Sequence, residues 1–177
     1  MSGRVNIGLI PTIAPYLLHH IVQPIKRTYP QLEIILHEVQ TEVMLKQLGE
    51  GTMDAGILAV PLETRGIEQI ILYNEPFYVA VNNQHEFAKK TKIIKEDLRG
   101  ETLLLLGEGH CLRGQVLEVC SYAMTRERKD FQDTSLETIR HMVSTGIGIT
   151  LIPQTAIVFK NLNQNSSIKY IPFSKPA

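Results

Sequence analysis

Short apolar runs alternate with segments of helical periodicity along this chain, and the alternation constrains the fold more than any other feature. Residues 5–10 are an apolar run, after which apolar residues recur every four positions until Pro30. A β-rich run at 32–39, a short helix over 41–48 and a buried strand at 54–60 follow. The first half is therefore predicted to be a β-α-β-α-β unit, which is typical of a parallel sheet covered by helices.

The second half continues the alternation after an irregular joint. Strand-like runs at 67–72 and 77–81 are separated by residues 74–76, where we expect a boundary between two lobes. The sequence Thr134-Ser135-Leu136-Glu137 forms a capping box and predicts a helix that stops at Gly146. The other predicted elements are a short helix at 95–98, a strand at 102–106, a helix from about 112, and strands at 148–152 and 168–173. The predicted fold class is α/β.

Composition and charge exclude several kinds of function. The chain has 177 residues, 44% of them hydrophobic, which is enough for one domain or two small lobes. Its 18 basic and 18 acidic residues form no long block of either sign, so we expect the chain by itself to bind nucleic acid poorly. Because it has neither a long apolar run nor a signal-peptide pattern, we expect a soluble cytoplasmic protein without membrane contact.

The sequence carries no convincing cofactor or metal motif. Gly107-x-Gly109 lacks the rest of a dinucleotide fingerprint, and the histidines have no ligand spacing with cysteines or acids, so we expect no cofactor and no metal. Ligands of parallel sheets bind beyond the carboxyl ends of the strands, which directs attention to the loops that follow them. Two of these loops bring Thr12 and Thr41 to expected helix N-termini, where a threonine ordinarily acts as a helix cap.

Cys111 lies where a thiol can be activated. It follows a glycine loop at the expected start of a helix, with His110 before it and Arg113 two positions after it. A helix N-terminus and a nearby cation both lower a thiol pKa, because they favour the thiolate. The setting suits a peroxide-reactive cysteine, and an ordinary inert thiol is the alternative that the residues leave open.

Cys120 lies instead on an apolar helical stripe with Leu112, Val116 and Val119. Taken alone it is best interpreted as a small buried hydrophobe, because cysteine is among the most buried residue types. Nine helical residues separate the α-carbons of the two cysteines by about 13.5 Å and place them on opposite sides of the helix. A disulfide allows at most about 7 Å, so a bond between them would require the helix to unwind.

The sequence Gly109-His110-Cys111-Leu112-Arg113, followed by a second cysteine nine positions after the first and by Thr134-Ser135-Leu136-Glu137-Thr138, resembles the regulatory domain of the OxyR family. These proteins are the hydrogen peroxide sensors among the LysR-type transcriptional regulators. The resemblance covers nearly the whole chain, including residues 7–18 and 146–153. It implies two Rossmann-like lobes of the periplasmic-binding-protein type, residues 4–74 with 152–177 and residues 75–151, with the sensing site in the cleft.

The resemblance also implies roles for the site residues. Cys111 is expected to be the peroxidatic thiolate, oxidised first to sulfenic acid, and Cys120 the resolving thiol of an intramolecular disulfide. Thr12 and Thr41 match positions whose hydroxyls line the peroxide pocket. The remaining two members of the expected pocket, His110 and Arg113, flank the nucleophile.

Partners are implied in the same way. They are hydrogen peroxide as the signal, a second copy of the chain in a homodimer or tetramer, and a glutaredoxin-like thiol reductant for reset. DNA and RNA polymerase are expected only through the full-length protein, because a winged helix-turn-helix would normally precede Val5 and none is present in the chain. Gly114 and Asp130 depart from the pattern, since an acidic residue and a histidine can occur there, which predicts a differently tuned peroxide reactivity.

Two other functions stay open at the level of sequence. An ordinary LysR-type effector domain would bind a small organic ligand and carry both cysteines incidentally. A thiol peroxidase would consume peroxide by catalytic turnover, whereas a sensor is oxidised once and reduced slowly. We expect the sensor, which controls antioxidant genes and is not an enzyme.

Overall fold

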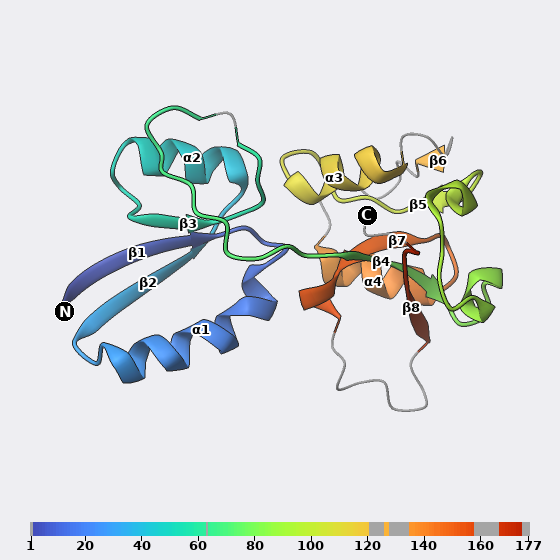
Figure 1. The fold of residues 1–177 in the computed structure, drawn as a ribbon, viewed down its shortest axis with the longest axis horizontal. Coiled ribbons are helices and arrows are strands. Elements are labelled where there is room, and N and C mark those ends of the chain that lie inside the picture. Colours follow the sequence, from blue (N-terminus) through green and yellow to red (C-terminus); the bar gives the residue numbers. More distant parts are fainter. Residues whose placement is uncertain (1, 63, 121–125, 128–134, 158–166, 175–177) are drawn as a thin grey trace. The chain divides into compact units, whose positions relative to one another are not determined.

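The computed structural model describes residues 2–62, 64–120, 126–127, 135–157 and 167–174 (Figure 1). The contacts divide the chain into two compact units. Unit 1 comprises Met1–Asn74 and Gly109–Cys111, and unit 2 comprises Glu75–Glu108 and Leu112–Ala177. The main segment of unit 1 thus ends at the irregular joint after residue 74. The chain returns to unit 1 for three residues only, Gly109–Cys111.

Unit 1 is a three-stranded parallel sheet with a helix on each face (Figure 1). Its elements are β1 (Gly3–Leu9), α1 (Ala14–Thr28), β2 (Leu32–Glu38), α2 (Thr41–Gly49) and β3 (Ala55–Ile57). The strand order is β2-β1-β3, and both outer strands run parallel to β1. The predicted β-α-β-α-β unit is confirmed, with β3 shorter than the expected strand at 54–60.

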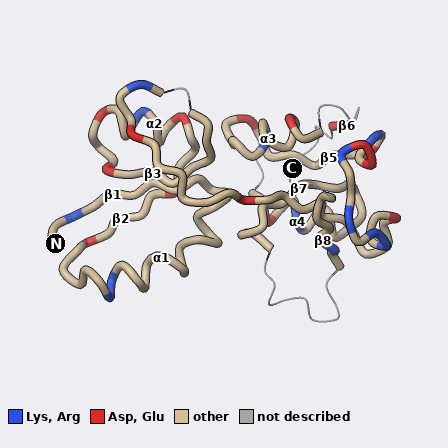
Figure 2. The backbone as a smooth tube through the Cα atoms, in the orientation of Figure 1, with Lys and Arg blue, Asp and Glu red and all other residues tan. Residues whose placement is uncertain are grey.

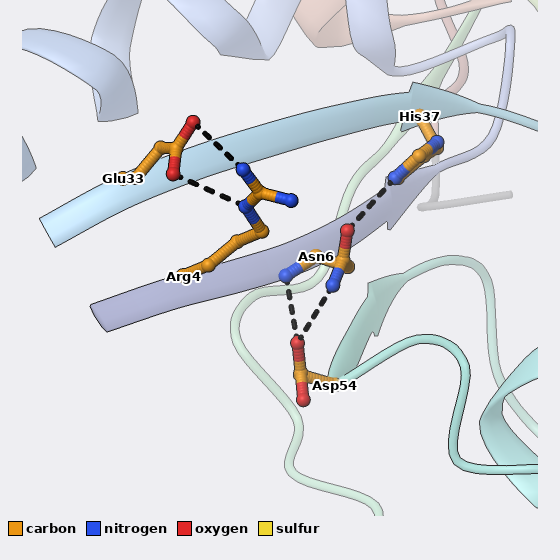
Figure 3. Close-up of polar contacts among 5 residues, drawn as sticks. All are labelled: Arg4, Asn6, Glu33, His37 and Asp54. Atoms are coloured by element: carbon orange, nitrogen blue, oxygen red, sulfur yellow. Dashed lines mark hydrogen bonds and ion pairs between the residues drawn. The ribbon is translucent and has the colours of Figure 1, made fainter.

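Polar side chains join neighbouring strands of this sheet (Figure 3). Arg4 of β1 donates from Nε to Glu33 of β2 at 3.1 Å, in the register that pairs these two residues. The backbone N–H of Asn6 donates to the Asp54 carboxylate at 2.7 Å, and its side-chain Oδ1 lies 3.3 Å from His37 Nε2. The contacts of Asn6 therefore tie the central strand to both of its neighbours.

Ten further elements lie in the described residues of unit 2, except that the first residue of α3 belongs to unit 1. They are β4 (Phe77–Asn82), η1 (Glu86–Lys89), η2 (Lys95–Leu98), β5 (Thr102–Leu103), α3 (Cys111–Cys120), β6 (Arg126–Glu127), α4 (Leu136–Ser144), β7 (Thr150–Pro153), η3 (Gln154–Ala156) and β8 (Ile168–Pro172). One sheet has the order β7-β4-β8, and a short parallel pair joins β5 to β6. The central strand β4 carries the fully buried Val79, Ala80 and Val81.

The predicted return of residues 152–177 to the first lobe is wrong. β8 pairs along β4 from Tyr78↔Pro172 to Asn82↔Ile168, so the described part of this segment belongs to unit 2. The pairing is antiparallel, as is that of β4 with β7, so the expectation of a parallel sheet fails here. Which strands pair across such distances depends on how the whole unit packs, and the local pattern does not encode it.

Two local predictions are also corrected. Residues 67–76 form no strand, and Ile70 and Ile71 are 74% and 71% exposed, because β propensity produces no strand without a partner to pair with. The helix predicted from the capping box begins at Leu136, and its cap is Ser135, whose Oγ accepts the N–H of Thr138 at 3.2 Å. Thr134 lies outside the described residues.

Basic and acidic residues are mixed along the described backbone (Figure 2). The segment that contains η1 and η2 is an example. There Lys90 Nζ lies 2.8 Å from Asp97, and its hydrogen bond lowers the pKa of that carboxyl. Within the described ranges, no helix combines the length and the apolar character needed to cross a membrane.

Candidate functional site

The helix α3 carries the two cysteines at its ends, Cys111 as its first residue and Cys120 as its last. They are not joined by a disulfide. Nine helical rises place their α-carbons about 13.5 Å apart, whereas a disulfide permits at most about 7 Å. The predicted starting position of Cys111 and the predicted separation of the pair are therefore both present in the structure.

Cys120 lies on the buried face of α3. The buried residues of the helix are Leu112, Val116, Val119 and Cys120, which confirms the predicted apolar stripe. Cys120 is 2% exposed, and burial raises the pKa of its thiol to about 11, with a smaller opposing effect from Lys95. At neutral pH this thiol is protonated and out of contact with solvent, so it is a poor nucleophile while α3 is intact.

Cys111 has a different environment, because it packs against the core of unit 1. The core cluster consists of Ile10, Ile13, Met44 and Met53, of which Met44 is fully buried, and Cys111 is a half-buried residue at its side. Unit 1 therefore holds Cys111 although nearly all of α3 belongs to unit 2.

Both predicted pocket threonines belong to segments that build this core cluster. Thr12 is 4% exposed and stands in sequence between two cluster members, Ile10 and Ile13. Thr41 begins α2 one helical turn before Met44, so the two side chains lie on the same side of the helix. The structure thus brings Cys111 and both threonine-bearing loops to one cluster.

Neither threonine acts as a helix cap, which corrects the expectation from sequence. The N-cap of α1 is Ile13 and that of α2 is Gln40, and neither makes a side-chain capping bond. The Oγ1 atom of Thr41 is buried and has no hydrogen-bond partner among the described residues. An unsatisfied buried hydroxyl costs about 1–3 kcal/mol, so this atom marks a place where a small polar molecule would be stabilised.

The loop before Cys111 is held by a residue that the sequence did not indicate. Gly109 has a φ of +86°, and a methyl group at its Cβ position would lie 2.7 Å from Gln40 Oε1 and 3.3 Å from Gln40 Nε2. The carboxamide of Gln40 therefore packs directly on the glycine backbone. His110, between Gly109 and Cys111, is half-buried.

Arg113 forms its contacts within unit 2. One guanidinium nitrogen donates to the Leu106 carbonyl oxygen at 3.1 Å, and the other to Glu127 Oε1 at 2.7 Å. These bonds tie the first turn of α3 to Leu106, which precedes the glycine loop at 107–109, and to β6. Glu127 stands in a run of charged residues without periodicity, so no signal in the sequence indicated it as a partner. Asp130 lies outside the described residues.

The chain matches the family described as LysR substrate binding domain over residues 1–177. It is 42% identical to the hydrogen peroxide-inducible genes activator of Haemophilus influenzae and 43% identical to the DNA-binding transcriptional dual regulator OxyR of Escherichia coli K12, each over 176 residues. Both alignments cover 99% of this chain but only 58% and 57% of the relatives, so the chain spans little more than half of their length.

Solved structures agree with this match. The reduced OxyR regulatory domain from Pseudomonas aeruginosa has a TM-score of 0.87 at 37% identity, with 99% of this chain and 84% of that chain covered. The oxidised form of OxyR has a TM-score of 0.86 at 43% identity, with coverage of 99% and 82%. A cysteine-to-serine variant of Corynebacterium glutamicum OxyR, bound to hydrogen peroxide, has a TM-score of 0.88 at 31% identity, with coverage of 97% and 54%.

The chain belongs to the LysR substrate binding domain family and has the α/β fold of its regulatory domains. Within that family it is of the OxyR type, as its identity to OxyR regulatory domains shows. Its relatives are regulators of transcription, which confirms the predicted class of protein.

Proposed function

We propose that this chain is the redox-sensing part of a LysR-type transcription factor, in which hydrogen peroxide oxidises Cys111 and a disulfide with Cys120 switches the conformation. The observation that carries the proposal is the buried Thr41 hydroxyl, which finds no hydrogen-bond partner in the ranges that the structure describes and lies in the unit whose core Cys111 contacts. Hydrogen peroxide has donors and acceptors on both oxygens, so it can satisfy such a hydroxyl. A related OxyR variant binds this molecule.

The chemistry proceeds in two steps. The Cys111 thiolate attacks one oxygen of hydrogen peroxide, so that an S–O bond forms, the O–O bond breaks and hydroxide leaves, oxidising the sulfur to sulfenic acid. The Cys120 sulfur then attacks the sulfenic sulfur, an S–S bond forms, and the hydroxyl leaves as water with the proton of the Cys120 thiol. Thr12, Thr41 and His110 would hold the peroxide in the first step. Arg113 would contribute by favouring the thiolate.

The distance along α3 converts the second step into a structural change. Because about 13.5 Å separates the two α-carbons in the helix, the disulfide cannot form until residues between them lose helical structure. The buried stripe of α3, with Cys120 at its end, must then leave its place in unit 2. Oxidation would therefore change the conformation of α3 and would not simply cross-link the folded structure.

The remaining steps belong to the whole protein. A homodimer or tetramer would transmit the change, DNA and RNA polymerase would be contacted through the full-length protein in the cytoplasm, and antioxidant genes would respond. A glutaredoxin-like thiol reductant would reset the disulfide.

Two valine substitutions of threonines with buried hydroxyls test the proposal. In a Cys120→Ser background, which retains sulfenic acid at Cys111, Thr41→Val should lower the rate constant of sulfenic acid formation about tenfold or more. It should also raise the free energy of unfolding by up to about 1–3 kcal/mol, since it removes a buried hydroxyl that has no hydrogen-bond partner in the described part of the chain. The matched control is Thr150→Val, because the Thr150 hydroxyl is buried but donates to the Leu104 carbonyl at 2.7 Å. That variant should lose about 1 kcal/mol of stability without change in rate.

An unchanged rate in Thr41→Val would remove the main support for a peroxide site beside Cys111. A wild-type chain that stays reduced in dilute peroxide would instead favour an effector domain for a small organic ligand.

A further inference from the structure

Met44 is part of the apolar core cluster of unit 1 and lies on the same face of α2 as Thr41. It is 0% exposed and follows Thr41 by one turn of α2. Its side chain rests on two glycines of the sheet: a methyl group at Gly56 would lie 2.5 Å from Met44 Sδ, and one at Gly8 would lie 3.1 Å from Met44 Cε. Any side chain at these two positions would displace the thioether, so the sheet holds it at a fixed depth.

The same thioether belongs to the core cluster against which Cys111 packs. Thr41, which carries the unsatisfied hydroxyl, and Met44 are on one face of α2, while Thr12 stands between the cluster members Ile10 and Ile13. The two threonines proposed to hold peroxide are therefore next to apolar residues of this cluster. Met44 and Met53 have the longest unbranched side chains among its members. An unbranched thioether fills irregular space closely, so the fully buried Met44 leaves little room beside these groups.

We propose that Met44 is a specificity-determining residue that closes the Cys111 site to alkyl hydroperoxides. This inference rests on the proposed function. For a general hydroperoxide ROOH, the thiolate takes the terminal oxygen, the O–O bond breaks, and RO⁻ leaves and is protonated to ROH, while the sulfur is oxidised to sulfenic acid. Hydrogen peroxide, in which R is a hydrogen atom, needs no room beyond its two oxygens. A tert-butyl group needs an apolar space of the kind that the Met44 side chain fills.

The test compares two peroxides in variants that share the Cys120→Ser background, so that Cys111 is the single thiol. Sulfenic acid at Cys111 is trapped with dimedone, and rate constants are measured for tert-butyl hydroperoxide and for hydrogen peroxide. Met44→Ala should raise the ratio of the first constant to the second about tenfold or more, because removal of a few heavy atoms from an apolar pocket relaxes discrimination by this order. Met44→Leu, which conserves volume, should leave the ratio within about twofold of the wild type.

A second methionine of the same cluster serves as a control. It distinguishes a specific effect of Met44 on peroxide selectivity from a general loss of packing in the core. Met53 is 4% exposed, and its sulfur also lies over the Cβ position of Gly8, but it is not on α2 beside Thr41. Met53→Ala should leave the ratio unchanged. An equal rise of the ratio in Met53→Ala, or no rise in Met44→Ala, would overturn the assignment to Met44.

The ratio of rate constants is measured on folded protein, so it can still be determined when Met44→Ala is strongly destabilised. If Met44→Ala does not fold, Met44→Val removes less of the side chain and should give a smaller rise of the same sign, and no rise there would equally contradict the inference. A wild-type Cys111 that does not react with hydrogen peroxide would contradict the proposed function instead. A normal hydrogen peroxide rate with an unaltered ratio would contradict only the role of Met44.

Discussion

Arg113 and Glu127 are joined by an ion pair of 2.7 Å that connects the first turn of α3 to β6. Their side chains are 22% and 30% exposed, so the pair is better shielded than an ordinary surface contact. The same guanidinium also donates to the Leu106 carbonyl oxygen. Arg113 lies between the two cysteines in α3, so unwinding of its first turn would disturb this contact, which makes it a restraint on the proposed switch.

Glu127→Gln should weaken that restraint by about 1 kcal/mol, because a charge-assisted bond becomes a neutral one. Amide hydrogens of residues 112–120 should exchange a few times faster, and disulfide formation after oxidation should be accelerated. Glu50→Gln is the matched control, since the Lys46–Glu50 pair is 3.9 Å long with side chains 74% and 53% exposed. Equal exchange in wild type and Glu127→Gln would show that the ion pair does not restrain α3.

The raised pKa of Cys120 predicts that the folded chain loses stability as the pH rises above 9. Its pKa is about 11 in the folded chain against an ordinary value of 9.0, so above pH 9 the unfolded chain releases this proton first. The free energy of unfolding must then fall as pH rises from 9 towards 11. Relative to Cys120→Ala, which lacks the titrating group, the chain should lose about 1–2 kcal/mol by pH 10.5.

Urea unfolding of the reduced chain at several pH values checks this, in a Cys111→Ser background that leaves one thiol. Subtraction of the Cys120→Ala curve removes the contribution of lysines and tyrosines, which titrate in the same range. A difference that stays constant between pH 8 and pH 10.5 would contradict the burial of Cys120 in α3.

Gly109→Ala should strain the loop that carries Cys111. The φ of +86° disfavours any side chain, and the new methyl group would meet Gln40 Oε1 at 2.7 Å. We expect a loss of about 1–2 kcal/mol, measured by urea unfolding. In the double variant Gln40→Ala with Gly109→Ala, the contact is relieved but the dihedral strain is not, so part of the loss should return. Full recovery would mean that the backbone conformation costs nothing.

The sequence predicted those parts of the fold that local patterns encode. The alternation that predicts β1, α1, β2 and α2 depends on residues close together in the chain, and the apolar stripe that ends at Cys120 follows helical periodicity. The pairing of β8 with β4 could not be predicted in this way, because it joins residues about 90 positions apart and depends on which strand completes the sheet. The exposed segment at Ile70 and Ile71 shows the same dependence, since its β-rich sequence finds no partner strand.

The sequence predicted only those parts of the candidate site whose residues are neighbours in one segment of the chain. Cys111 and its helix start could be recognised from neighbouring residues, whereas the contact of Gln40 with Gly109 and that of Glu127 with Arg113 join separate loops. The threonines illustrate the opposite error. Their position after strands is typical of caps, but Ile13 and Gln40 are the N-cap residues, and among the residues described the Thr41 hydroxyl has no hydrogen-bond partner. Only the packed structure distinguishes the two uses of a threonine.

In the proposed switch, Cys111 and Cys120 become bonded when peroxide is present, and peptide mass spectrometry detects this bond. Trypsin cuts after Arg99, Arg113 and Arg126, so each cysteine lies in its own peptide, 100–113 or 114–126. After brief exposure to dilute hydrogen peroxide, these two peptides should appear as one disulfide-linked species that lacks two hydrogen atoms and separates on reduction. Separate peptides, with Cys111 either still a thiol or oxidised alone, would contradict the switch.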